Sequence, residues 1–257
     1  MNRKMLIQTL KSGALIALIA VVSGFAAGER KALVCRSLDV NVAQLSGVYF
    51  IDESAVIAHV FDSGVPIIGE AMDGINLVKI RHALQQLPSV KEATVYGRFD
   101  GSLVVDITQR MPLLRVVGDD KPGYYIDTEG QPMPLSSSYS ALVPVVTGKL
   151  PMELGNDPEA IANHPNVKAA FELVNYIENR PFWKAQVEHI IVLPGGDFEF
   201  VPRVGGARVV LGDLRDLDDK FNRLKAFYKA MAAKGNLNTY KRINLKYRDQ
   251  VVCERYF

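Results

Sequence analysis

The alternation of hydrophobic and polar residues between positions 75 and 112 predicts one helix followed by a two-stranded hairpin. Apolar residues of the helix recur at spacings of three and four, and this stripe consists of Leu77, Ile80, Leu84 and Leu87. Pro88 ends the helix, because proline lacks a backbone N–H. Asp100-Gly101 indicates a tight turn between the strands. The second strand is predicted to be half-buried, because Leu103, Val105 and Ile107 alternate with a second set of residues, which are Val104, Asp106 and Thr108.

The preceding residues predict a strand and another helix. Residues 32–41 alternate in polarity and indicate a strand. Asp52 is placed to cap a helix that ends at Ser63-Gly64. We expect its buried side to consist of Val56, Val60 and Phe61. The order strand, helix, helix, strand, strand therefore predicts an α+β unit over residues 32–111, with two helices covering one face of a three-stranded sheet.

Residues 112–257 predict a second, mostly antiparallel β domain with helices. Asp157-Pro158 is typical of a helix start, and Pro165 restarts or kinks that helix. We expect its apolar face to consist of Val167, Ala170, Phe171, Val174 and Ile177. The strands are expected at 113–117, 124–127, 131–135, 187–193, 198–202, 207–211, 242–247 and 250–255.

The strongest helical periodicity lies in residues 214–234. Its apolar residues are spaced as in a heptad repeat and comprise Leu214, Leu217, Phe221, Leu224, Tyr228 and Met231. Such spacing is compatible with a coiled coil or with a helix packed on a sheet. The stripe is too short for a coiled coil, so packing on the sheet is the favoured prediction.

An uncharged stretch at residues 13–28 indicates contact with a membrane. Its 16 residues are fewer than the roughly twenty that cross a bilayer. Upstream apolar residues extend it if Lys11 reaches back to the membrane surface. Two readings compete: a signal peptide cleaved near Ala26-Ala27-Gly28, and an anchor at 12–28 with a cytoplasmic tail at 1–11. Both readings export the rest of the chain, and the anchor is favoured in part by the family resemblance described below.

The charge of the chain is unevenly distributed. The whole chain carries +2, but residues 220–257 hold ten Lys and Arg against two acids, so this segment carries +8 and the remainder −6. A basic end suggests an acidic partner or an anionic surface, while the plainer interpretation is a solvated basic face. Because the chain is exported, a nucleic-acid partner is not expected. With 48% hydrophobic and 23% charged residues the chain is globular rather than disordered.

The sequence contains no recognisable catalytic, cofactor or metal motif. Four dispersed histidines, His59, His82, His164 and His189, form no ligand pattern, and those at 59 and 82 are expected on exposed sides of helices. Cys35 and Cys253 lack zinc spacing, and they are either a disulfide or two small buried thiols. We therefore expect no enzyme, no cofactor and no metal, although carboxylates that meet only in the fold would leave a hydrolase open.

Several stretches together resemble a known family. They are residues 50–52 (FID), 87–93 (LPSVKEA), 109–112 (QRMP), 124–134 (YYIDTEGQPMP), 143–148 (VPVVTG) and 243–252 (INLKYRDQVV). In order and spacing they resemble the bacterial cell-division family FtsQ/DivIB in its Bacteroidetes-type form, and residues 32–111 resemble a POTRA domain. The resemblance extends over essentially the whole chain, although no single stretch is as specific as a metal signature.

The resemblance implies a non-enzymatic scaffold of the division machinery. Such a protein crosses the cytoplasmic (inner) membrane once, with its N-terminus in the cytoplasm and most of its chain in the periplasm at the septum. It recruits other divisome proteins, notably the FtsB–FtsL pair. The alternatives are a POTRA-bearing component of envelope assembly or secretion, and a secreted enzyme or ligand-binding protein.

The resemblance also implies a partner site at the last strand of the β domain. A basic–aromatic pair of the family matches Lys246-Tyr247, and the family often has arginine where this chain has Lys246. A lysine gives up the bidentate contact that arginine makes with a carboxylate. The plainer reading of Tyr247 is an ordinary strand aromatic. The implied partner-binding residues are Lys246, Tyr247, Gln250, Val251, Val252 and Cys253.

Overall fold

The structure is a computed structural model of the whole chain. It describes residues 13–23, 33–43, 47, 49–118, 120–137, 139–152, 157–235 and 237–256. The chain divides into two compact units at Gln109 and Arg110, two residues before the boundary expected after residue 111. Each unit has its own hydrophobic core.

Near the N-terminus, residues 13–23 form a helix whose side chains are exposed. In the described part of the chain, no helix is both long and apolar enough to span a bilayer. The expected tail at 1–11, and residues 12 and 24–28 of the expected span, lie outside the described residues.

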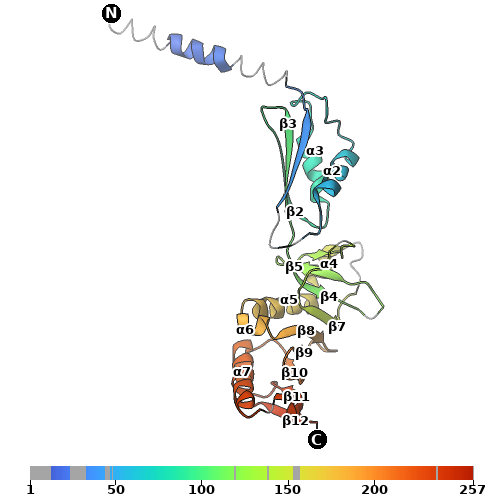
Figure 1. The fold of residues 1–257 in the computed structure, drawn as a ribbon, viewed down its shortest axis with the longest axis vertical. Helices are drawn as coiled ribbons and strands as arrows, with labels where there is room; N and C mark the ends of the chain where they lie inside the picture. The colour runs from blue at the N-terminus through green and yellow to red at the C-terminus, as the bar shows by residue number, and fades with distance from the viewer. Residues whose placement is uncertain are drawn as a thin grey trace, which may run out of the picture. The chain divides into compact units, whose positions relative to one another are not determined.

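The first unit has the expected order of strands and helices. Its elements are β1 (Ser37–Ala43), α2 (Glu53–Asp62), α3 (Leu77–Gln85), β2 (Val90–Gly97) and β3 (Ser102–Gln109). The sheet order is β1-β3-β2, with β1 parallel and β2 antiparallel to the central β3. Both helices lie on the same face of this sheet (Figure 1).

Side-chain caps and apolar stripes explain the helices of this unit. The carboxylate of Asp52 accepts a hydrogen bond from the Ala55 N–H at 2.8 Å, so the predicted cap of α2 is confirmed. The stripes of α2 and α3 and the inner face of β3 form the core, which includes Val56, Val60, Ile80, Leu84, Leu103, Val105 and Ile107. The prediction that Phe61 is buried is wrong, because Phe61 is 50% exposed. It directly follows Val60, so it is rotated by about 100° around the helix, away from the core.

Two strand predictions in this unit need correction. The first strand begins at Ser37, and Val34 makes only an isolated bridge to Ala71, so the predicted range 32–41 starts too early. Strand β3 is not half-buried, because Val104 on its outer face is also fully buried. As the central strand, β3 has a neighbour on each side, and Val104 pairs in register with Asp39 and Tyr96.

The second unit is built around one large sheet. In chain order its elements are β4 (Pro112–Val116), β5 (Tyr124–Asp127), β6 (Pro132–Met133), β7 (Val145–Gly148), α4 (Pro158–Asn163), α5 (Pro165–Glu178), α6 (Pro181–Lys184), β8 (Val187–Val192), β9 (Phe198–Pro202), β10 (Arg208–Gly212), α7 (Leu217–Ala233), the 3-10 helix η1 (Leu237–Thr239), β11 (Tyr240–Asn244) and β12 (Val252–Arg255). Within the described residues, nine strands pair in the order β12-β11-β10-β9-β8-β7-β4-β5-β6. Most neighbours are antiparallel, and the parallel pairs are β10–β11, β4–β7 and β7–β8.

Helices α5, α6 and α7 supply the other half of this core. Asp157 caps α4 through the Ala160 N–H at 3.0 Å, and Pro165 starts α5 as a separate helix. Helix α7 packs on the sheet, since Phe221 is buried and its ring stacks on Phe200 of β9 with centroids 5.9 Å apart. The prediction of a helix on the sheet, rather than a coiled coil, is therefore confirmed.

Candidate functional site

Strand β12 forms one edge of the large sheet. It pairs antiparallel with β11, where Val252 lies opposite Asn244 and Cys253 opposite Ile243. In the described part of the chain no strand lies on its other side. An edge strand of this kind presents unpaired backbone N–H and C=O groups, which can pair with a strand from another chain.

The structure places the six predicted site residues on β12 and on the loop before it. Strand β11 ends at Asn244, so the expected strand over 242–247 is too long, and Lys246, Tyr247, Gln250 and Val251 lie in the loop. The strand ends here because the Asn244 side chain accepts the Lys246 N–H at 3.0 Å, which closes a local turn. Val252 and Cys253 begin β12.

The predicted residues differ in exposure. The Tyr247 side chain is 54% exposed and Val252 is 44% exposed, so both are available to another protein. Val251 and Cys253 instead pack partly against the core of this unit. The expected site therefore has an exposed aromatic residue on the loop and an exposed aliphatic residue on the strand, and the residues on either side of Val252 pack partly against the core.

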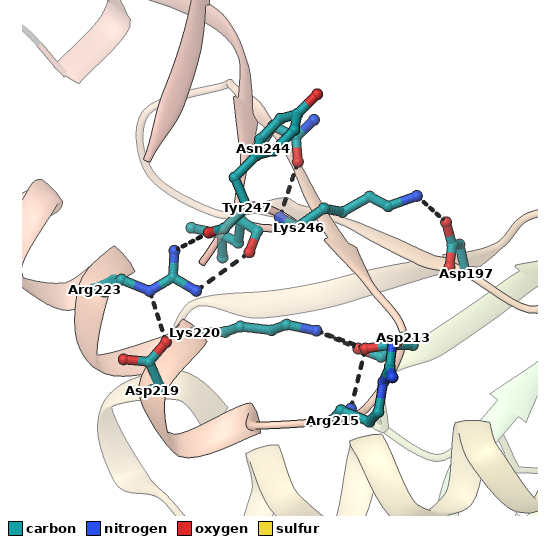
Figure 2. A network of polar contacts seen from close by, with 10 residues as sticks. Asp197, Asp213, Arg215, Asp219, Lys220, Arg223, Asn244, Lys246 and Tyr247 are labelled. Carbon is teal, nitrogen blue, oxygen red and sulfur yellow. Dashed lines mark hydrogen bonds and ion pairs between the residues drawn. The ribbon is translucent and has the colours of Figure 1, made fainter. Parts of the chain in front are cut away.

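Arg223 of α7 holds this loop in place. Its Nη1 donates to the carbonyl of Tyr247 at 2.9 Å and to that of Gln250, and its Nη2 donates to Leu245 at 3.3 Å. Asp219, one helical turn earlier, accepts from Nε at 2.8 Å and orients the guanidinium. Figure 2 shows the guanidinium pointing toward the Tyr247 carbonyl. One side chain thus fixes three backbone carbonyls of the loop that presents Tyr247.

Sequence reasoning did not identify Arg223, which it counted only as one of the basic charges. The local spacing of Asp219 and Arg223 is a signal of an ion pair on one helix face. The carbonyls that Arg223 binds lie more than twenty residues later in the chain, so no local pattern reveals them.

Lys246 is bound within the chain. Its ammonium donates to the carboxylate of Asp197, in the β8–β9 turn, at 2.6 Å (Figure 2). This hydrogen bond and the charge of Asp197 raise the pKa of Lys246. Its stem crosses Gly212, where an added Cβ would lie 2.7 Å from the Lys246 Cγ. The cation expected to meet an acidic partner thus already has a carboxylate partner in its own chain.

Asp213 joins the start of α7 to the same network. Its carboxylate accepts from the largely buried Lys220 at 2.9 Å and from Arg215 Nε at 2.6 Å. Chiefly because Lys220 and then Arg215 donate hydrogen bonds to the ionised form, the pKa of Asp213 falls to about 2. These groups, with Asp197 and Lys246, line a polar hollow of about 770 Å³.

These ion pairs are suited to holding the loop before β12 and the start of α7 in place rather than to catalysis. Asp197, Asp213 and Asp219 are each paired with a cation, so they are poor candidates for a free catalytic base. In the residues that the structure describes, no three His, Cys, Asp or Glu side chains are placed to hold a metal ion.

Both cysteines are free thiols, and burial raises the pKa of each. His59 is half-buried with Nε2 3.2 Å from the Ala83 carbonyl, which corrects its expected exposure, while His82 is exposed.

The basic character of residues 220–257 is partly neutralised inside the chain. Five of its ten cations form ion pairs, and these are Lys220–Asp213, Arg223–Asp219, Lys241–Glu254, Arg242–Glu199 and Lys246–Asp197. The other five, Lys225, Lys229, Lys234, Arg248 and Arg255, make no ion pair with any described residue. The cations available to a partner therefore lie on α7 and just after it, at Arg248 beside Tyr247, and at Arg255 on β12.

The chain is thus an α+β protein in which a small β-α-α-β-β unit is followed by a unit built on a large sheet, one edge of which is open in the described residues. Comparison with known families agrees with this architecture. Residues 33–108 match the POTRA-like domain, and residues 111–254 match the family described as FtsQ/DivIB, C-terminal related. A curated relative, the cell division protein FtsQ of Salinibacter ruber (strain DSM 13855 / M31), is 27% identical over 195 residues, which cover 72% of this chain and 71% of the relative.

The second family match covers more than half of the 257 residues, so the chain belongs to the FtsQ/DivIB family. Membership of this family, which is non-enzymatic, implies a role in cell division with divisome proteins as partners.

Proposed function

We propose that this chain is a single-pass scaffold of the division machinery, which recruits FtsB- and FtsL-like proteins through the open edge of β12. The observation that carries the proposal is that an open sheet edge lies next to a loop that is held in place and exposes an aromatic side chain. Strand β12 has one side open in the described chain, and Arg223 holds the loop that exposes Tyr247. Main-chain pairing supplies affinity in such a complex, and side chains beside the edge supply specificity.

The structure changes the role proposed for each site residue. Tyr247 is the apolar anchor with a polar tip. Val252 is exposed on β12 and contacts the strand that the partner adds. Lys246 contributes by fixing the loop to Asp197, while the exposed cations left for an acidic partner are Arg248 on the loop and Arg255 on β12. Gln250, Val251 and Cys253 hold the backbone of the edge in register.

The proposed location is the cytoplasmic membrane at the division septum, with the N-terminus in the cytoplasm. The support is the uncharged stretch at 13–28, of which residues 13–23 form an apolar helix. Alkaline carbonate extraction tests the anchor: the protein should stay in the membrane pellet, and release into the supernatant would contradict it. The POTRA-like unit is proposed as a second contact surface for other divisome members.

Substitution of Tyr247 by glutamate tests the partner site. The full-length chain is captured from solubilised membranes, and co-purified FtsB- and FtsL-like proteins are quantified. We expect Tyr247→Glu to remove most of the captured partner, because a charge would have to be buried in the interface. Leu142→Glu is the matched control, since Leu142 is a fully exposed apolar residue of the same unit. Equal capture by both variants would count against the site.

Localisation separates the proposal from its alternatives. A fluorescent fusion of the full chain should form a band at midcell in dividing cells. Even staining of the envelope would instead favour a component of envelope assembly or secretion, or a secreted enzyme or ligand-binding protein.

A further inference from the structure

A second candidate surface lies at the opposite end of the β8–β9 hairpin from Asp197. It is a hollow of about 360 Å³ between α6, α7 and the loop after β9. Its walls are mostly carbon and include Phe182, Val204, Tyr228 and Ala232. Because the five residues of β9 span roughly 16 Å, this hollow is separate from the network beneath the β12 loop.

Phe182 and Val204 keep much of their surface open at this hollow. Phe182 is 41% exposed and Val204 is 48% exposed. Behind them, the Tyr228 and Trp183 rings lie with centroids 6.3 Å apart and form a rigid aromatic base. A concave apolar site on a rigid base is suited to receive one bulky side chain of a partner.

Two lysines stand at this hollow without a counter-charge. Lys225 and Lys229 lie four residues apart on α7, and neither forms an ion pair with any residue that the structure describes. The Lys225 ammonium sits 5.3 Å from the centroid of the Phe182 ring. Like charges at this helical spacing repel each other, so the arrangement is unfavourable for α7 alone. Carboxylates from a partner would relieve that repulsion.

We propose that this hollow binds an acidic segment of another protein. One apolar side chain of the size of leucine or phenylalanine enters between Phe182 and Val204. Carboxylates that flank it in the partner pair with Lys225 and Lys229. The buried apolar side chain supplies most of the affinity, and the ion pairs at the rim select an acidic segment over a basic one.

The shape of the surface favours a protein segment over a lipid membrane. A membrane presents a broad anionic plane, which pairs best with cations on a flat or convex face. Here the two cations border a hollow. This surface lies apart from the proposed β12 site, so it offers a second contact that does not depend on that site.

Photo-crosslinking in living cells tests the proposal on the full chain. The photoreactive residue p-benzoylphenylalanine replaces Val204, or Leu142 as an exposed apolar control outside the hollow. We expect a crosslink at Val204, absent at Leu142, to a protein segment in which an apolar residue is flanked by Asp or Glu. Mass spectrometry of the crosslinked peptide identifies that segment.

Charge reversal of Lys225 and Lys229 then tests whether these two lysines select the acidic segment. The double variant Lys225→Glu, Lys229→Glu should reduce the Val204 crosslink at least tenfold, while Lys149→Glu, Lys168→Glu, two exposed lysines elsewhere in the unit, should leave it unchanged. Partner capture through β12 should be the same in both double variants. The proposal is overturned by a crosslink to lipid, to a second copy or to a segment without acidic residues, by insensitivity to charge reversal, or by no crosslink above the control.

Discussion

Arg223 is the residue that connects helix packing to the shape of the candidate site. Its guanidinium supplies donors in a fork that can reach several carbonyls at once, which a lysine cannot do in the same geometry. Its side chain is only 16% exposed, while two of the carbonyls that it binds belong to the exposed residues Tyr247 and Gln250. The sequence allowed Tyr247 to be selected through family resemblance. It could not reveal Arg223 or Asp197, because their partners are distant in the chain and only the fold brings them together.

Replacement of Arg223 should loosen the loop. We expect Arg223→Ala to lower the free energy of unfolding by roughly 1.5–3 kcal/mol, since it removes charge-assisted hydrogen bonds to three backbone carbonyls, one of which belongs to the buried Leu245. Partner capture should fall with it. Arg203→Ala is the matched control: Arg203 pairs with Glu188 on the surface, both more than half exposed, and such pairs contribute less than about 1 kcal/mol. Urea denaturation measures both variants, and equal losses would contradict the bracing role.

Asp213 should make stability depend on pH in the acid range. Its pKa in the folded chain is about 2, below the ordinary 3.8, so the ionised form stabilises the fold. This contribution is complete above about pH 4 and is lost as the pH falls toward 2. Asp213→Asn should therefore be less stable than the native chain at neutral pH, and the two should converge near pH 2.

Urea midpoints at neutral pH, at about pH 4 and at about pH 2 measure this convergence. Glu172→Gln is the control, because Glu172 is exposed on α5 and has no ion pair among the described residues. Its difference from the native chain should stay flat with pH. A constant deficit of Asp213→Asn across the whole range would show that its charge is not what stabilises the fold.

At the scale of the elements, local chemistry predicted where helices begin better than where strands end. Asp52 and Asp157 cap their helices as expected, because capping depends on residues only three positions apart. The end of β11 was predicted too late, since Asn244 turns the chain before Lys246. The burial of Val104 on the outer face of β3 and the order of the nine strands depend on non-local pairing, which periodicity does not encode.

The end of β10 depends on a glycine. Gly212 has φ of +77°, and an added Cβ would also meet the stem of Lys246. Gly212→Ala should therefore cost more than the roughly 1–2 kcal/mol of a left-handed alanine. Gly206→Ala is the control, because Gly206 has φ of +61° and nothing lies within 4 Å of its added Cβ. Thermal unfolding compares the two, and an equal cost would show that the Lys246 stem moves aside freely.

At the scale of the molecule, the chain consists of two units, each with its own hydrophobic core. The sequence predicted both units and their class from periodicity and resemblance. It predicted a basic C-terminal end, but not that half of those cations are already paired inside the chain. Four of the five pairs use acids at 197–219, which precede the basic segment, and the fifth uses Glu254 within it.

The central claim is that an added strand pairs with β12. Hydrogen–deuterium exchange of the full chain, with and without its FtsB- and FtsL-like partners, measures this most directly. Pairing predicts that amides in Val252–Arg255 exchange more slowly in the complex, while those of the β8–β9 hairpin do not change. Exchange in β12 that stays the same on binding, with slowing elsewhere on the chain, would contradict the account.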